Sequence, residues 1–189
     1  TQWFKDEGDA VVLLGESVDV HDALQGLGGS AYLQVIHGRK TGTPPRCGLE
    51  QARILHTTLL GLIQSGLVKS AHDCSEGGLA VALAESCISQ LMGRETPRLI
   101  GAQIDLAHIN AVRQDALLYG ETQSRIVVSC KPLDAVKIVE RAKLLGVPAA
   151  RIGTVGGDKL GIKTVSAEIS WNVTELHDVW WNSIARIMA

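Results

Sequence analysis

Short apolar runs alternate along this chain with longer segments in which apolar residues recur every three or four positions. Short runs are typical of buried strands, and the longer period is that of helices with one buried face. The pattern predicts strands over residues 10–16, 67–72, 100–106, 125–130, 151–155 and 160–165. It predicts helices over residues 31–37, 49–65, 109–119, 134–145 and 173–188, and another that begins after Gly77 and has Leu91 on its apolar face.

Glycine and proline mark the connections between these elements. Residues 40–48 contain two prolines and two glycines and are expected to form a surface loop, while Gly66 and Gly146 are natural helix ends. The segment 156–158 (Gly-Gly-Asp) separates the last two predicted strands and is a hairpin signal. Because a hairpin interrupts the alternation, the expected fold class is α/β (α+β), a mixed β-sheet flanked by helices.

Composition limits the possible partners of the chain. A length of 189 residues allows one well-buried core, so we expect a single domain over residues 1–189. The 18 basic and 20 acidic residues give a net charge of −2 without a dense basic run, so nucleic acid is not an expected partner. An anionic ligand would have to be held by local geometry.

The cysteines and the hydropathy pattern predict a cytoplasmic protein. The spacing of the four cysteines, at 47, 74, 87 and 130, suggests neither a zinc site nor a disulfide framework. No apolar run approaches the roughly 20 residues that a membrane span requires, so no membrane partner is expected. The chain begins without methionine in a polar stretch, which favours a domain of a longer protein.

The segment 70–85 joins a predicted strand to a predicted helix through a polar turn that contains two glycines. Asp73 would end the strand and offers the hard oxygen ligands that Mg²⁺ prefers, and Ser75 can cap the helix or contact a phosphate. Gly77 and Gly78 would let a ligand approach the backbone at the positive end of the helix dipole. This predicts a metal-bound phosphate site. A well-packed turn in which Ser75 and Glu76 merely cap the helix is an equal alternative.

Two further loops carry polar groups. Residues 119–125 gather a carboxylate, an amide, two hydroxyls and a guanidinium, but a solvent-exposed pair of Glu121 and Arg125 would explain them as well. Residues 26–30 could bind a phosphate at the start of the next helix, or form a flexible turn. His72 is interpreted as a structural residue at the end of its strand.

The three loops together resemble one protein family. Residues 28–32 (GGSAY), 72–80 (HDCSEGGLA) and 120–125 (GETQSR) are similar to the C-terminal domain of the aminoimidazole ribonucleotide synthetase superfamily. The first and last of these segments narrow the resemblance to the synthetase subunits of phosphoribosylformylglycinamidine synthases. Residues 153–158 and the later pair Trp180-Trp181 also look like the C-terminus of those subunits, so the resemblance covers nearly the whole chain.

The resemblance implies an ATP-dependent carbon–nitrogen ligase of purine biosynthesis. Formylglycinamide ribonucleotide, ATP and glutamine-derived ammonia would give formylglycinamidine ribonucleotide, ADP and phosphate. The implied cofactors are Mg²⁺ and ATP. The implied metal ligands are Asp73 and Glu121. The implied substrate- or nucleotide-binding residues are Gly28, Gly29, Ser30, Ser75, Gly77, Gly78, Gln123 and Ser124.

The same resemblance implies what the chain lacks. The family's catalytic histidine and principal ATP-binding residues belong to an N-terminal domain, so no catalytic residue is expected here. The implied partners are that domain, a glutaminase and small accessory subunits. Two positions depart from the family pattern, since Cys74 replaces a small β-branched residue and Ala31 replaces a frequent acidic residue.

Two other interpretations of the sequence remain open. The chain could be the C-terminal domain of another ATP-using member of the superfamily, such as aminoimidazole ribonucleotide synthetase, selenophosphate synthetase, thiamine-phosphate kinase or a hydrogenase-maturation protein. It could also be a non-catalytic scaffold domain that organises a complex.

Overall fold

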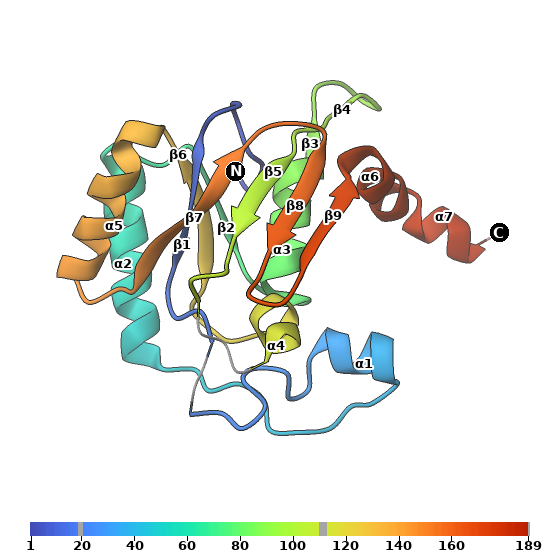
Figure 1. Cartoon of the computed structure of the whole chain (residues 1–189), viewed down its shortest axis with the longest axis horizontal. Coiled ribbons are helices and arrows are strands. Elements are labelled where there is room, and N and C mark those ends of the chain that lie inside the picture. The colour runs from blue at the N-terminus through green and yellow to red at the C-terminus, as the bar shows by residue number, and fades with distance from the viewer. Residues whose placement is uncertain (19–20, 110–112, 189) are drawn as a thin grey trace.

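The structure, a computed structural model, describes residues 1–18, 21–109 and 113–188. These residues form a seven-stranded sheet in the order β2-β6-β1-β7-β5-β8-β9 (Figure 1). All neighbouring strands are antiparallel except the parallel pair β5 and β8. The strands are β1 (Ala10–Leu14), β2 (Ser70–Asp73), β5 (Ala102–Asp105), β6 (Ile126–Cys130), β7 (Ala149–Val155), β8 (Lys159–Lys163) and β9 (Glu168–Asn172). The expected mixed sheet is confirmed.

Helices cover both faces of this sheet. The long helices α2 (Leu49–Gln64) and α5 (Ala135–Leu144) lie side by side on one face, and α3 (Gly78–Ile88) lies on the other (Figure 1). The shorter helices are α1 (Ala31–His37), α4 (Gln114–Tyr119), α6 (Val173–Trp181) and α7 (Ser183–Met188), with a 3₁₀ turn over Pro132–Asp134. A small hairpin, β3 (Gln90–Leu91) with β4 (Pro97–Arg98), follows α3.

The two-sided cover explains the apolar runs in the sequence. Every residue of β1 and of β6 is buried. Val12 and Leu14 belong to the core beneath α2 and α5, whereas Val11 and Leu13 belong to the core beneath α3. A strand buried on both faces therefore takes apolar residues at nearly every position. The exception is Ser129 of β6, whose hydroxyl is hydrogen-bonded to that of Ser70.

Most predicted helices and strands correspond to elements of the structure, with their ends shifted by a few residues. The helix after Gly77 ends at Ile88, so Leu91 lies in strand β3 and not on that helix. The predicted hairpin over 151–165 is wrong, because β5 lies between β7 and β8 and pairs with both. The predicted C-terminal helix is two helices, and β9 and the β3–β4 hairpin were not predicted. The predicted helix over 109–119 corresponds to α4, and its positions 110–112 lie outside the described residues.

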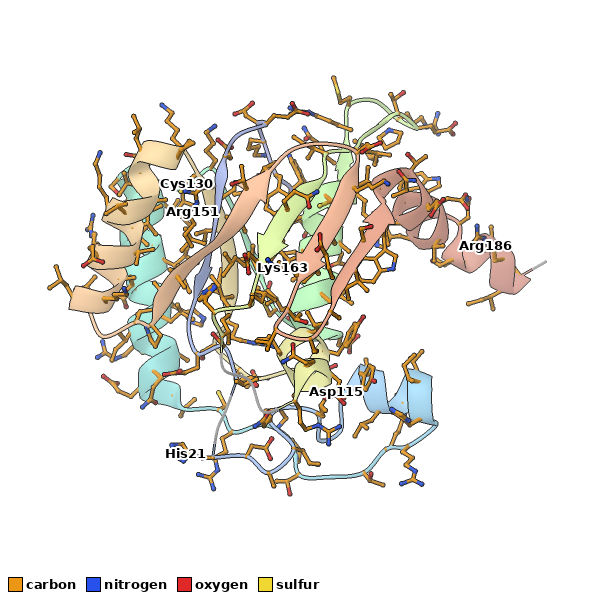
Figure 2. All side chains as sticks on the ribbon, in the orientation of Figure 1. His21, Asp115, Cys130, Arg151, Lys163 and Arg186 are labelled. Carbon is orange, nitrogen blue, oxygen red and sulfur yellow. The ribbon has the colours of Figure 1, made fainter. Side chains whose placement is uncertain are left out.

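The remaining physical expectations concern the thiols and the membrane. All four cysteines are free, with only Cys47 exposed; Cys130 lies on β6 within the core beneath α5 (Figure 2). None of the helices in the described ranges is long and apolar enough to cross a membrane.

We predict that Gly153→Ala destabilises the fold. Gly153 lies in β7 between β1 and β5, and a Cβ there would overlap the carbonyl oxygen of Gln103 and meet Ile104 Cα at 3.0 Å. Urea denaturation should show a loss of about 1–3 kcal/mol in unfolding free energy, the usual cost of overpacking. Gly93→Ala is the matched control, since its Cβ would meet nothing closer than Thr96 Oγ1 at 3.7 Å. Equal stability of the two variants would contradict the prediction.

We also predict that one of the four thiols reacts quickly with a colorimetric disulfide reagent in the native protein. Burial raises the pKa of Cys74 to about 11 and that of Cys87 to about 12, so both stay protonated and inaccessible near neutral pH. Burial likewise raises the pKa of Cys130 to about 11. In denaturant all four should react. Loss of the fast phase in Cys47→Ser would assign it, and a second fast native thiol would contradict the burial pattern.

Candidate functional site

The turn between β2 and α3 places Asp73 and Ser75 side by side. Asp73 ends β2 and lies opposite Ile126 of β6, and its side chain is 70% exposed. The Ser75 hydroxyl donates a hydrogen bond to Asp73 Oδ2, and this bond is the main cause that lowers the pKa of the Asp73 carboxyl. Asp73 is therefore an ionised, accessible carboxylate at neutral pH. Ser75 does not cap α3, because the N-cap is Gly77, which has no side chain to accept a hydrogen bond.

The two glycines of this turn are required by packing. Gly77 and Gly78 both have positive φ values, 78° and 65°. A Cβ at Gly78 would overlap the carbonyl oxygen of Gly120, so α3 could not lie as close to the end of α4. The packing alternative for these glycines is thus supported by the structure, whatever ligand the turn also contacts.

Glu121 joins the three loops that the sequence singles out. Its Oε1 accepts hydrogen bonds from the backbone N–H of Gly77 at 3.0 Å and from that of Ala31 at 2.8 Å. The carboxylate thus satisfies free N–H groups at the starts of α3 and α1. A metal ion could share Glu121 only through its second oxygen.

The loop that contains Gly28, Gly29 and Ser30 uses its polar groups within the fold. Gly28 packs against the Thr43 carbonyl, and the Gly29 N–H donates to the Thr41 carbonyl at 2.9 Å. Ser30 is the buried N-cap of α1, and its hydroxyl accepts a hydrogen bond from the Leu33 N–H at 3.3 Å. In this arrangement the backbone N–H groups of Gly29, Ser30 and Ala31 already have partners within the fold.

Arg125 organises the site from beneath, a role that the sequence did not reveal. The alternative of a solvent-exposed Glu121–Arg125 pair is wrong, since Arg125 is only 1% exposed. Its guanidinium donates to the carbonyl oxygens of Ser17 at 2.9 Å, Thr122 at 3.3 Å and Gly120. Burial lowers the pKa of Arg125. Its position just before a mostly apolar strand was the available signal in the sequence.

The Asp73 turn and the 121–125 loop line one pocket of about 370 Å³. The lining residues are Cys47, Ala52, His56, Asp73, Cys74, Ser75, Glu76, Glu121, Gln123, Ser124, Arg125 and Ile126. Five predicted site residues therefore meet here, but Gly28, Gly29, Ser30, Gly77 and Gly78 do not line this pocket. Cys47 and His56 were missed, because they reach the pocket only through tertiary packing of α2 and its preceding loop.

Gln123 and Ser124 also border a second pocket of about 450 Å³, near Gly15 and Pro148. Ser124 has a φ of 60°, which is unusual for a residue with a side chain, and its carbonyl packs directly against Gly15. Gln123 donates from Nε2 to the Glu121 carbonyl at 3.2 Å. Backbone strain of this kind is often found at functional sites.

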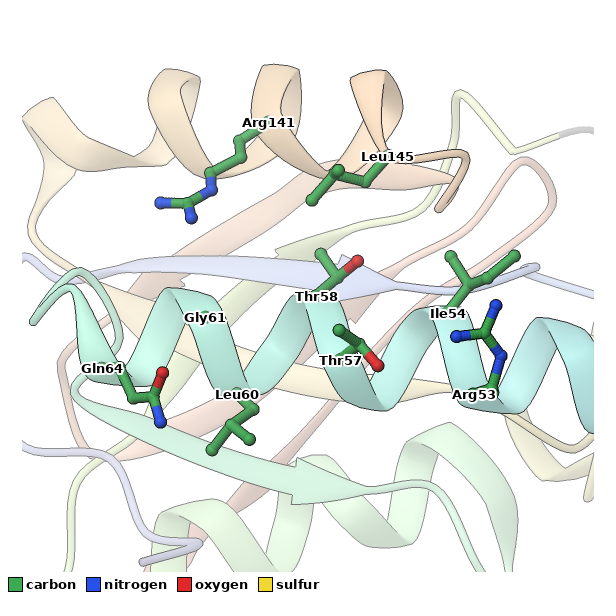
Figure 3. A pocket seen from close by; sticks show the side chains of 9 residues that line it. All are labelled: Arg53, Ile54, Thr57, Thr58, Leu60, Gly61, Gln64, Arg141 and Leu145. Atoms are coloured by element: carbon green, nitrogen blue, oxygen red, sulfur yellow. The ribbon is translucent and has the colours of Figure 1, made fainter.

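A third pocket, of about 490 Å³, lies between α2 and α5 and contains none of the predicted site residues (Figure 3). Arg141 extends from α5 toward Gly61 of α2, and Thr57 and Thr58 lie on the α2 side (Figure 3). Arg53, at its other end, is paired with Glu50. This pocket shares no residue with the Asp73 pocket and carries none of the loop chemistry.

His72 lies behind the Asp73 turn. Its Nε2 is 2.8 Å from Glu85 Oε2 on α3, and its side chain is 12% exposed. Its Nδ1 is 3.6 Å from Asp73 Oδ1. The ring is held between two carboxylates.

A metal ion would not be held by this chain's side chains alone. Across the described residues, no group of three or more His, Cys, Asp or Glu side chains is placed to bind one. Mg²⁺ commonly takes one or two carboxylates and completes its shell with phosphate oxygens and water. The exposed, ionised Asp73 carboxylate fits that role as a single ligand to a phosphate-bound Mg²⁺.

Comparison with known proteins agrees with the fold and with the family resemblance. The model of one family, AIR synthase related protein, C-terminal domain, matches residues 6–165. The PurL subunit of phosphoribosylformylglycinamidine synthase from Anaeromyxobacter dehalogenans (strain 2CP-C) is 40% identical over 98% of this chain. The corresponding subunit from Moorella thermoacetica is 36% identical over 98%. The chain spans 23% of the length of each of these relatives.

Solved structures show the same fold at low sequence identity. Thermotoga maritima PurL complexed with FGAR matches this chain with a TM-score of 0.72 at 20% identity. The match covers 93% of this chain and 29% of the PurL chain. A chain of a HypE–HypF complex matches with a TM-score of 0.54 at 19% identity. This match covers 91% of the present chain and 54% of the matched chain. The family model spans most of the chain, so the chain belongs to the AIR synthase related proteins, as a member of their C-terminal-domain family.

Proposed function

We propose that this chain is the C-terminal domain of a PurL-type phosphoribosylformylglycinamidine synthase, an ATP-dependent ligase of purine biosynthesis in the cytoplasm. The enzyme would convert formylglycinamide ribonucleotide to formylglycinamidine ribonucleotide with ammonia from glutamine. The observation that carries the proposal is the 40% identity to a PurL subunit over 98% of the chain. Thermotoga maritima PurL, whose fold this chain shares, has been crystallised with ATP and with FGAR, which supports the same ligands here.

The Asp73 pocket is the part of the site that this chain would supply. Asp73 is accessible and ionised, and the Ser75 hydroxyl fixes one of its oxygens. When bound, Mg²⁺ neutralises developing charge on the transferred phosphoryl group. Asp73 would hold this ion, and Gln123 and Ser124 would line the path of the substrate or nucleotide.

The remaining groups would come from other parts of the enzyme. We propose that an N-terminal domain supplies the catalytic and principal ATP-binding residues, because the chain matches only 23% of its relatives' length. We further propose a glutaminase and small accessory subunits as partners. The existence of a Thermotoga maritima PurLQS structure supports an assembly of this kind.

A scaffold domain without ligand binding is the second candidate. It is favoured by one observation, that Glu121 and the polar groups of the 28–30 loop are engaged within the fold. The two functions differ in whether the chain has any affinity for a magnesium nucleotide.

We predict that the chain binds Mg²⁺–ADP and that Asp73→Ala weakens this binding by roughly tenfold or more, measured by isothermal titration calorimetry. The reason is the loss of an exposed carboxylate in this pocket, one oxygen of which accepts a hydrogen bond from the Ser75 hydroxyl. Asp105→Ala is the matched control, because Asp105 is also an exposed aspartate at the end of a strand. Absence of binding by the unsubstituted chain at millimolar ligand would favour the scaffold function.

We predict that the 189-residue chain alone forms no formylglycinamidine ribonucleotide from ATP, ammonia and substrate. Placed instead of the matching segment of the Anaeromyxobacter dehalogenans PurL subunit, it should support product formation, and Asp73→Ala in that chimera should abolish it. Product from the isolated chain would overturn the proposed division of the site. A folded chimera that binds its partners but makes no product would overturn the proposed function itself.

A further inference from the structure

His72 and Glu85 form a bridge from α3 to the Asp73 carboxylate. His72 precedes Asp73 on β2, and its backbone is fixed by pairing with Val127 of β6. Glu85 lies on α3, whose neighbouring residues Leu83 and Ser86 are buried. Both ends of the bridge thus stand on rigid elements rather than on loops.

The bridge fixes the imidazole ring. The 2.8 Å contact between His72 Nε2 and Glu85 Oε2 is a short hydrogen bond to a carboxylate, and the ring is 12% exposed. A ring that is largely covered and held at one nitrogen has little freedom to turn. Its other nitrogen, Nδ1, lies 3.6 Å from Asp73 Oδ1, beyond the length of a hydrogen bond but close enough to limit where that oxygen can move.

Asp73 would otherwise be mobile. Its side chain is 70% exposed and stands at the end of an edge strand, where a short side chain can exchange between rotamers. The His72 ring borders one carboxylate oxygen, and the Ser75 hydroxyl binds the other. The two contacts together restrict the direction in which the carboxylate can face.

We propose that His72, anchored by Glu85, is a positioning residue that holds the Asp73 carboxylate in one orientation toward the pocket. That the oriented carboxylate binds a phosphate-bound Mg²⁺ rests on the proposed function. The orientation of the carboxylate itself does not depend on that function. Removing a group that contacts and orients a metal ligand commonly lowers metal affinity by roughly 10- to 100-fold.

Two substitutions of His72 separate positioning from packing. In His72→Gln the terminal amide can reach Glu85, but no group remains beside Asp73. In His72→Asn the amide takes the place of Nδ1 beside Asp73. The measurements are the three-bond Hα–Hβ couplings of Asp73, which report its rotamer distribution by NMR, together with Mg²⁺–ADP titration and thermal denaturation.

The expected result is that His72→Gln averages the Asp73 couplings and weakens Mg²⁺–ADP binding by roughly tenfold, whereas His72→Asn keeps both closer to the unsubstituted chain. Unchanged Asp73 couplings in His72→Gln would overturn the proposal. Equal losses in both variants, in step with a lower melting temperature, would also overturn it and leave a packing role. Averaged couplings without Mg²⁺–ADP binding by any form would uphold the positioning and reject the nucleotide-binding role proposed for this pocket.

Discussion

The guanidinium of Arg125 is buried, and its hydrogen bonds reach the carbonyl oxygens of Ser17, Gly120 and Thr122. A buried charge that loses its hydrogen bonds costs several kcal/mol, about as much as a large share of a domain's stability. The segments that carry these carbonyls cannot move apart without that cost. Because the Cys74 N–H donates to the Arg125 carbonyl at 2.9 Å, the Asp73 turn is held to the same centre.

Glu121 binds backbone N–H groups in the way that Arg125 binds backbone carbonyls. It accepts from two N–H groups at helix starts, while Arg125 donates to carbonyls. The two opposite charges of segment 121–125 thus bind backbone groups instead of each other. A loop arranged this way has a shape that is set before any ligand arrives, which is the condition for binding a metal-bound phosphate without a large ordering cost.

The sequence predicted those features that depend on local pattern. The predictions of strands β1 and β6 and of helices α2 and α5 were correct. Burial on both faces gives a strand its apolar run, and burial on one face gives a helix its apolar period, so each pattern can be read directly from the sequence. The pairing of β5 was not predictable. A Gly-Gly-Asp turn has the same sequence whether the two strands that it joins pair with each other or have a third strand between them. In the site, Asp73 and Glu121 were found through polar loops, whereas the burial of Arg125 and the approach of His56 depend on the finished fold.

The place of β5 between β7 and β8 sets an order on the growing chain during synthesis. β5 ends at Asp105, but its two partners begin only at Ala149 and Lys159. Until the ribosome has passed both, β5 has two unpaired edges of the kind that recruit other chains. The strand is short, and its residues Gln103 and Asp105 are polar and exposed, which limits that hazard. The segment can therefore remain solvated until β7 and β8 have been synthesised.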